Sequence, residues 1–226
     1  KRMHNLINNK FILLIIIVFS LNGFSDARHI FEEAKSGVVY VITDKGTGSG
    51  VLISKDGHLL TNWHVVEGAE LDSIKIAFHP IYYSNDVEDY FFEVKVIKTA
   101  KVSDLALLKI INPPKNIKVI NISSIIPAVG SEAHAIGHPH DAYWTYTKGY
   151  ISQHRTNYSW QYNKEDGEHV ADVYQMQTPI GEGSSGGPLL NRHGNLIGIN
   201  TFGSKENQSL NYAVDVTEII AFLANK

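Results

Sequence analysis

The sequence predicts an all-β protein of two halves, followed by one helix at its C-terminal end. Short runs rich in β-branched and aromatic residues recur along the 226-residue chain and are separated by turn-forming residues. Residues 112–116, NPPKN, divide these runs into two groups, because consecutive prolines cannot join a central strand. Apolar residues at helical spacing follow the second group.

The strands are expected in the order in which the runs occur. Asp56 and Gly57 offer a hairpin turn between two strands of the first group. The expected ranges in the first group are 37–43, 50–54, 58–62, 73–78, 91–98 and 104–110. Those in the second group are 132–137, 146–153, 171–177, 195–201 and 209–214. The helix is expected behind a capping Asp215 or Thr217, with Val216, Ile219, Ile220 and Leu223 on its apolar face.

Composition sets limits on the class of protein. A chain with 43% hydrophobic residues can bury one good core or two small ones, and its net charge of −3 leaves no basic footprint for nucleic acid. The sequence has no cysteine, so packing alone must hold it together. Any function must therefore come from a local site.

Residues 1–27 have the layout of a secretory signal peptide. Lys1, Arg2 and Lys10 precede the apolar run 11–19, and small residues surround Asp26. The alternative is an uncleaved membrane anchor, but nine consecutive apolar residues fall short of the ~20 that a spanning helix needs. We therefore expect an exported protein, periplasmic or secreted, which contacts a membrane only if this segment stays uncleaved.

The segment 181–190, GEGSSGGPLL, places two serines in a glycine-rich run. A nucleophilic serine needs backbone N–H groups that converge on an oxyanion, which favours neighbours without side chains. Around Ser185 these neighbours are glycines, whereas around Ser184 one place falls to Glu182. Ser185 is therefore the predicted nucleophile, although a glycine-rich surface loop would explain the segment taken alone.

His64 and Asp104 are the candidate partners of Ser185. His64 stands where an apolar strand gives way to a turn, and Asp104 opens an apolar strand, where an unpaired charge would be costly to bury. Either residue alone has an ordinary structural explanation. Together with Ser185 they follow the order His, Asp, Ser, which is one of the chain orders of known catalytic triads.

With these residues in place, the sequence resembles the trypsin-like serine proteases of the bacterial Htr/Deg type from about residue 36 to residue 224. The motifs that carry the resemblance are GSGVLISKDGHLLTNWHVV, SDLALLKI, AIGHP, TKGYISQ, GSSGGPLLNRHGNLIGINTF and LNYAVDV. The resemblance implies a chymotrypsin-like fold of two six-stranded antiparallel β-barrels. Residues 28–118 would form the first barrel, and residues 119–226 the second barrel with the C-terminal helix. Many members carry a PDZ domain after the protease, and here we expect the protease domain without one.

The resemblance also implies the role of each site residue. His64 would act as general base and then general acid, Asp104 would orient it, and the N–H groups of Gly183 and Ser185 would form the oxyanion hole. The aspartate that precedes the nucleophile in digestive trypsin-like enzymes is replaced here by Ser184, so no buried ion pair can order the oxyanion loop. The walls of the substrate pocket are expected to include Thr178, Ile180, Asn200, Thr201 and Phe202.

The predicted function is a serine endopeptidase that cleaves unfolded or exported proteins after small or medium apolar residues. The alternatives are an endopeptidase with glutamate preference, a catalytically inactive binding module of the trypsin fold, and an esterase. Protein or peptide substrates are the expected partners, without nucleic acid. His138, His140 and Asp141 could chelate a metal, but zinc would need another protein ligand and outer-shell support, so we predict no metal or cofactor.

Overall fold

The computed structural model describes residues 27–79, 91–162, 167–204 and 209–225. The predicted signal peptide lies outside these residues, apart from Ala27. Within them, no helix is both long enough and apolar enough to cross a membrane.

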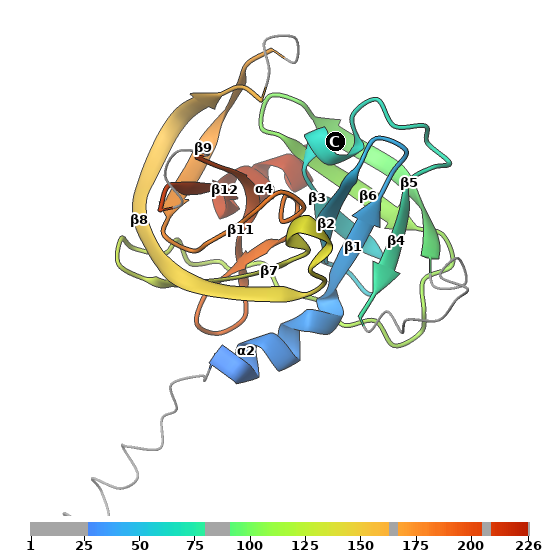
Figure 1. The fold of residues 1–226 in the computed structure, drawn as a ribbon, viewed down its shortest axis with the longest axis horizontal. Helices are drawn as coiled ribbons and strands as arrows, with labels where there is room; N and C mark the ends of the chain where they lie inside the picture. Colours follow the sequence, from blue (N-terminus) through green and yellow to red (C-terminus); the bar gives the residue numbers. More distant parts are fainter. Residues whose placement is uncertain (1–26, 80–90, 163–166, 205–208, 226) are drawn as a thin grey trace, which may run out of the picture.

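The strands of the first half form a closed antiparallel barrel, on the right in Figure 1. Its strand order is β1-β2-β3-β6-β5-β4. The strands are β1 (Val38–Ile42), β2 (Thr47–Leu52), β3 (His58–Thr61), β4 (Lys75–Phe78), β5 (Phe91–Ala100) and β6 (Leu105–Ile110). Each one overlaps a strand range predicted from the sequence.

The second half forms another closed antiparallel barrel, with the order β10-β11-β12-β9-β8-β7. Its strands are β7 (Glu132–Gly137), β8 (Thr145–Trp160), β9 (His169–Met176), β10 (Pro188–Leu190), β11 (Leu196–Gly203) and β12 (Asn211–Asp215). The chymotrypsin-like double barrel of six strands each is therefore confirmed. The exact boundary between residues 118 and 119 stays a prediction, because it falls in the irregular stretch between β6 and β7 that contains NPPKN.

The C-terminal helix α4 (Val216–Ala224) packs Val216, Ile219 and Phe222 into the protein. Asp215 is the capping residue, because its side chain accepts a hydrogen bond from the backbone N–H of Glu218. Among the described residues, two further α-helices were not predicted. They are α2 (Ala27–Ala34), which precedes the first barrel, and the single-turn α3 (Trp63–Val66) between β3 and β4.

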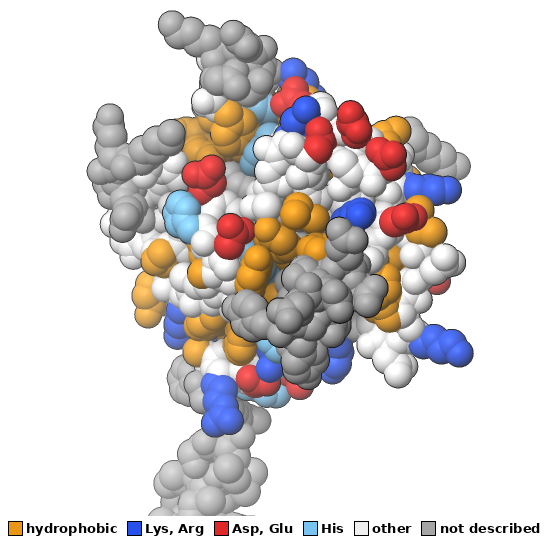
Figure 2. All heavy atoms as spheres, turned by 45° about the vertical axis from the view of Figure 1, so that its right-hand side comes forward, with side chains coloured by type: hydrophobic (Ala, Val, Ile, Leu, Met, Phe, Trp, Pro, Cys, Tyr) orange, Lys and Arg blue, Asp and Glu red, His pale blue; other side chains and the backbone are white. Residues whose placement is uncertain are grey.

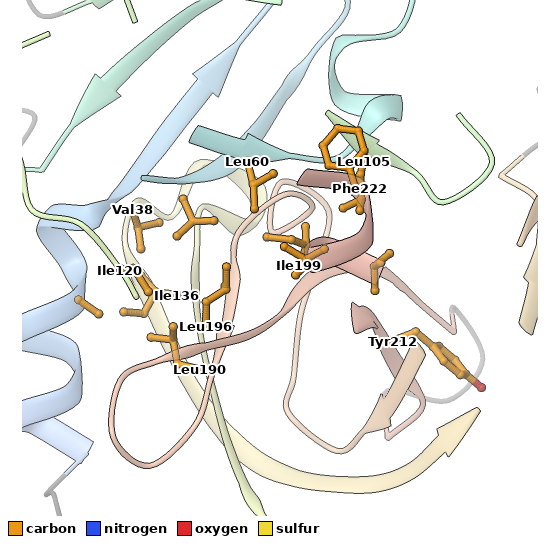
Figure 3. Close-up of a cluster of buried hydrophobic side chains, with 14 of the residues drawn as sticks. Val38, Leu60, Leu105, Ile120, Ile136, Leu190, Leu196, Ile199, Tyr212 and Phe222 are labelled. Atoms are coloured by element: carbon orange, nitrogen blue, oxygen red, sulfur yellow. The ribbon is translucent and has the colours of Figure 1, made fainter. Parts of the chain in front are cut away.

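One hydrophobic cluster joins the barrels and the flanking helices. Val38, Leu60 and Leu105 of the first barrel meet Ile136, Leu190 and Ile199 of the second, as Figure 3 shows. Ile30 and Ala34 of α2 and Phe222 of α4 also belong to this cluster. Because the cluster crosses from one barrel to the other, it fixes how they face each other.

Ionisable side chains are mixed over the surface seen in Figure 2, where acidic and basic groups lie among one another. This view gives no single-sign patch of the kind that nucleic-acid binding requires.

Candidate active site

Strand pairing brings His64 and Asp104 together. Thr61 at the end of β3 pairs with Ala106 near the start of β6. His64 lies just beyond this rung on α3, and Asp104 lies just before it. The amide of Asn62 closes the junction by donating to the carbonyl oxygen of Asp104 over 2.9 Å.

The imidazole of His64 contacts the carboxylate of Asp104 directly. Its Nδ1 lies 3.0 Å from Oδ1 and 2.9 Å from Oδ2, and the backbone N–H of His64 donates to Oδ1 over 3.0 Å. The Asp104 side chain is fully buried, whereas that of His64 is 22% exposed. This geometry leaves the far edge of the ring open to a second partner.

The carboxylate of Asp104 stays ionised although it is buried. Burial alone would raise the pKa of this carboxyl group, but the His64 ring and the hydrogen bonds from His64 and Thr201 hold the pKa below its ordinary value. The Thr201 hydroxyl lies 2.5 Å from Oδ2. Asp104 can therefore accept a hydrogen bond from the protonated Nδ1 of His64 and fix the orientation of the ring.

Ser185 lies in the turn before β10, and the first barrel helps to hold it. The backbone N–H of Ser49 in β2 donates to the carbonyl oxygen of Ser185 over 2.8 Å. Gly186 follows at φ +84°, and a Cβ there would lie 2.1 Å from the carbonyl oxygen of Ser49. Only glycine fits this close approach, which explains the residue after the serine.

The Ser185 hydroxyl donates to the carbonyl oxygen of Thr201 over 2.9 Å. It is thus turned towards β11 instead of towards the imidazole. His64 and Ser185 nevertheless line the same cleft, which has a volume of about 630 Å³. The other described residues of its lining are Glu67, His140, Tyr162, Ile180, Gly181, Glu182, Thr201, Phe202, Gly203, Ser204 and Asn211.

The backbone ahead of Ser185 is held on several sides. The carbonyl oxygen of Glu182 accepts from the N–H of His140 over 2.8 Å, so the N–H of Gly183 in the same trans peptide points away from that turn. Gly183 adopts φ +94°, and a Cβ there would meet the carbonyl oxygen of His138 at 2.4 Å. Ser184 braces the turn with neutral bonds, since its N–H donates to the carbonyl oxygen of Gly181 and its Oγ accepts from the Gly181 N–H.

A buried pair supports this turn from behind. The Ser49 hydroxyl donates to the carbonyl oxygen of Gly183 over 2.8 Å and lies 2.8 Å from Nδ1 of His138. A hydroxyl has one proton, so Nδ1 of His138 must be the donor in the second contact. Burial lowers the pKa of His138 to about 3, so the ring is neutral. Its Nε2 has no hydrogen-bond partner among the described residues.

The residues predicted to line the substrate pocket divide into two sets. Ile180, Thr201 and Phe202 line the cleft. Thr178 and Asn200 are fully buried, with side chains that bond to the carbonyl oxygens of Ala133 and Pro188. These two residues support the wall from behind.

The residues considered as a metal site point to different partners. His138 bonds to Ser49, His140 lines the cleft, and Asp141 accepts from the Tyr40 hydroxyl over 3.1 Å. Among the described residues, His154, Asp172 and Asp215 do bring ligand atoms within 4.8 Å of one another. Asp215, however, already binds Nε2 of His154 and caps α4, and Asp172 accepts from the backbone N–H of Asn157 over 2.8 Å.

Sequence reasoning missed Ser49, Tyr162 and the structural role of His138. Ser49 carried a signal, since it stands between glycines in a segment shared with the resembled family. Tyr162 gave none, because its contacts depend on how the hairpin of β8 and β9 reaches the first barrel.

The double barrel, with His64 and Ser185 at one cleft and the buried Asp104 bonded to His64, defines a protein of the chymotrypsin-like class. A family model described as "Trypsin-like peptidase domain" matches residues 48–199, and the chain belongs to this family. The resemblance to Htr/Deg-type proteases is likewise confirmed by curated relatives. Protease Do-like 1, chloroplastic, from Arabidopsis thaliana is 32% identical over an alignment of 188 positions that covers 76% of this chain and 40% of that protein. The periplasmic pH-dependent serine endoprotease DegQ of Escherichia coli is 36% identical over 159 residues, covering 70% of this chain and 31% of DegQ.

Solved structures agree with the fold. The serine endoprotease from Yersinia pestis superimposes with a TM-score of 0.70 at 28% identity and covers 88% of this chain and 65% of its own. The Rv3671c protease from M. tuberculosis in its active form gives a TM-score of 0.73 at 22% identity, over 86% of this chain and 82% of its own. By contrast, the chain spans less than half the length of the two curated relatives, Protease Do-like 1 and DegQ.

Proposed function

We propose that this protein is a serine endopeptidase, with Ser185 as nucleophile, His64 as base and then acid, and Asp104 as the group that orients His64. The observation that carries the proposal is the bond between Nδ1 of His64 and a buried, ionised Asp104 at a cleft that Ser185 also lines. An imidazole held in this way presents its other nitrogen as a base. Family membership supports the same chemistry.

The reaction requires the Ser185 hydroxyl to leave the carbonyl oxygen of Thr201 and turn to Nε2 of His64. This is a change of side-chain rotamer, and hydrogen bonds of catalytic groups often form only when substrate binds. As the serine oxygen attacks the peptide carbonyl, His64 takes the serine proton and passes it to the leaving amine, so that the C–N bond breaks and an acyl-enzyme remains on Ser185. Water, which gives a proton to His64, then attacks this ester, and the proton returns to the serine oxygen as the acid product leaves. The N–H groups of Gly183 and Ser185 would stabilise the oxyanion, and the bond from Glu182 to His140 favours that orientation of Gly183.

Cleavage after small or medium apolar residues agrees with the cleft lining. Asn211 and Ile180 both lie against Gly203, where a Cβ would be 2.5 Å from Oδ1 of Asn211 and 4.0 Å from Cγ1 of Ile180. A neutral amide and an aliphatic chain therefore limit the depth of the pocket. Glu67 and Glu182 among the described lining would repel a substrate glutamate, which disfavours the alternative preference.

Export is part of the proposal and rests on the signal-like residues 1–27 and on relatives such as DegQ, which is described as periplasmic. Amino-terminal sequencing of protein recovered from the exported fraction would test it. A first residue near Arg28 supports cleavage, whereas an intact amino terminus supports a retained anchor.

The experiment that tests the activity is incubation with unfolded casein, followed by mass spectrometry of the fragments. Ser185→Ala should lower turnover by about 10⁴- to 10⁶-fold. Ser184→Ala is the matched comparison and should only reduce the activity, because it removes the bond from the Gly181 N–H but leaves the nucleophile in place. Fragments from wild type that end in small apolar residues support the proposed preference, and fragments that end in glutamate favour the alternative. Binding of casein without cleavage would instead indicate an inactive module.

A further inference from the structure

Tyr162, just after β8, contacts both His64 and Asp104. Its hydroxyl lies 2.8 Å from Oδ2 of Asp104, and its ring packs on the His64 ring with centroids 4.3 Å apart. We propose that Tyr162 is a positioning residue, which holds the Asp104 carboxylate and the His64 ring in the arrangement needed for proton transfer. This inference rests on the proposed function of His64, Asp104 and Ser185.

The protonation states make Tyr162 a donor. Burial and the Asp104 charge raise the pKa of Tyr162 well above its ordinary value, so the phenol keeps its proton. An ionised Asp104 can only accept. The Thr201 hydroxyl lies near the same carboxylate oxygen and 2.7 Å from the Tyr162 hydroxyl, so the two hydroxyls together solvate Oδ2. These donors replace the water that a buried carboxylate lacks.

Tyr162 is itself held by aromatic rings at the end of the hairpin of β8 and β9. Trp160 pairs with His169 across the two strands, and their rings stack with centroids 5.4 Å apart. The rings of Tyr162 and His169 meet edge to face, with centroids 5.2 Å apart. The His169 ring also lies near Trp63 of α3, which follows β3 of the first barrel, with centroids 5.7 Å apart. The position of the phenol therefore follows from packing between the barrels.

The same hairpin end is bonded to the turn that carries Asp104. Nδ1 of His169 lies 2.7 Å from the carbonyl oxygen of Lys101, and the N–H of Val170 donates to the carbonyl oxygen of Val102 over 2.8 Å. Asp104 has φ +53°, a left-handed conformation that is unfavourable for a residue with a side chain. The second barrel thus fixes both the backbone and the carboxylate of a residue that belongs to the first barrel.

Loss of the Tyr162 hydroxyl has a defined electrostatic effect. With one donor fewer, the Asp104 carboxylate is less stabilised and attracts the imidazolium proton of His64 more strongly. His64 should then become protonated at a higher pH. Asp104 and Tyr162 contact the ring directly, and Glu67, His140 and Glu182 are the other titratable groups of the described cleft lining. None of these three is changed by the substitution, so the shift reports on the hydroxyl.

The test is Tyr162→Phe, which keeps the ring and removes the hydroxyl. We expect kcat on a peptide substrate to fall about tenfold with KM within about twofold, since the lost bond is to a charged group. The acid limb of the kcat/KM profile should move to higher pH. Tyr150→Phe on β8 is the matched control, because both tyrosines are partly exposed, at 47% and 37%, but only Tyr162 belongs to the described cleft lining, so Tyr150→Phe should behave as wild type. Wild-type kcat and an unshifted profile in folded Tyr162→Phe protein would overturn the proposal.

A second measurement does not depend on proteolysis. Proton NMR of protein with ¹⁵N-labelled histidine follows the titration of the His64 ring, whose resonances are assigned with His64→Ala. In Tyr162→Phe the midpoint of this titration should lie at higher pH than in wild type, and an equal midpoint would refute the positioning role. If wild type cleaves nothing but the midpoint still moves, the proposed function fails while the role of Tyr162 stands.

Discussion

Ser49 joins β2 of the first barrel to the backbone that precedes Ser185. Its hydroxyl donates a hydrogen bond to the carbonyl oxygen of Gly183, and its backbone N–H donates one to the carbonyl oxygen of Ser185. Digestive trypsin-like enzymes order this loop with a buried ion pair, but Ser184 carries no charge, and its hydrogen bonds among the described residues stay within its own turn. Hydrogen bonds between uncharged groups, made by Ser49 and Ser184, therefore order this loop in place of the ion pair.

Ser49→Ala should lower kcat about 10- to 100-fold with little change in KM. It leaves the buried carbonyl oxygen of Gly183 and Nδ1 of His138 without a partner, which loosens the N–H groups proposed for the oxyanion. Steady-state kinetics on a peptide substrate would measure the change. Ser54→Ala is the matched control, since Ser54 also bonds to a histidine, His58, within the first barrel. Equal kinetics of both variants would contradict this role of Ser49.

His138 should make the fold sensitive to acid. Its pKa is about 3 in the folded protein because of burial, against about 6.5 in an unfolded chain. Between these values the unfolded chain binds a proton that the folded chain does not. Stability is therefore lost as the pH falls through this window, by about 3 kcal/mol between pH 7 and pH 4.

The variant His138→Asn keeps a donor to Ser49 and removes the titration. Urea unfolding at a series of pH values should give a free energy of unfolding that falls less steeply below pH 6.5 than in wild type. Other groups, such as the buried His134 with its lowered pKa, contribute to both proteins and cancel in the comparison. Parallel curves for the two proteins would show that His138 does not set the acid limit.

At the scale of elements, Asp215 ends β12 and begins α4. Its Oδ1 accepts from the Glu218 N–H and the Thr217 hydroxyl, while Oδ2 lies 2.7 Å from Nε2 of His154 on β8. The sequence left Asp215 and Thr217 as alternative caps. The structure assigns the cap to Asp215 and makes Thr217 a donor to it.

Asp215→Ala should lower the free energy of unfolding by about 2 kcal/mol, since it removes the helix cap and the partner of His154. Thr217→Ala should cost less, because the cap itself remains. Thermal or urea unfolding monitored by circular dichroism would compare the two variants. A larger loss in Thr217→Ala would reverse the assignment of the cap.

The elements that the sequence did not predict are set by contacts between distant parts of the chain, and the local residue pattern does not reveal such contacts. β10 has only three residues and begins with a proline, so it is defined by its pairing with β7 and β11. β8 was expected to end at residue 153, but it continues to Trp160 because it pairs with β9 along a mostly exposed stretch. α2 buries Ile30 and Ala34 in the core between the barrels, and that core does not show in a sequence.

At the scale of the whole molecule, the cleft exists because one core holds the two barrels together. Residues that bear the proposed chemistry come from both barrels, and Tyr162 and Ser49 reach from one to the other. The sequence predicted His64, Asp104 and Ser185 through residue chemistry and family motifs. It could not predict which hydroxyls surround Asp104, or that the Ser185 hydroxyl rests on the carbonyl oxygen of Thr201, because both depend on how the barrels face each other.

The central claim is that Ser185 is a nucleophile activated by His64. Labelling with a fluorophosphonate probe tests this most directly, because the probe forms a covalent bond only with an activated serine hydroxyl and needs no knowledge of the substrate. Mass spectrometry of intact protein should show one phosphonyl group on wild type and on Ser184→Ala, with the modified fragment containing Ser185. Ser185→Ala should remain unlabelled, and His64→Ala should label far more slowly. A label that persists in Ser185→Ala, or a wild type that stays unlabelled beside a reactive reference protease, would contradict the account.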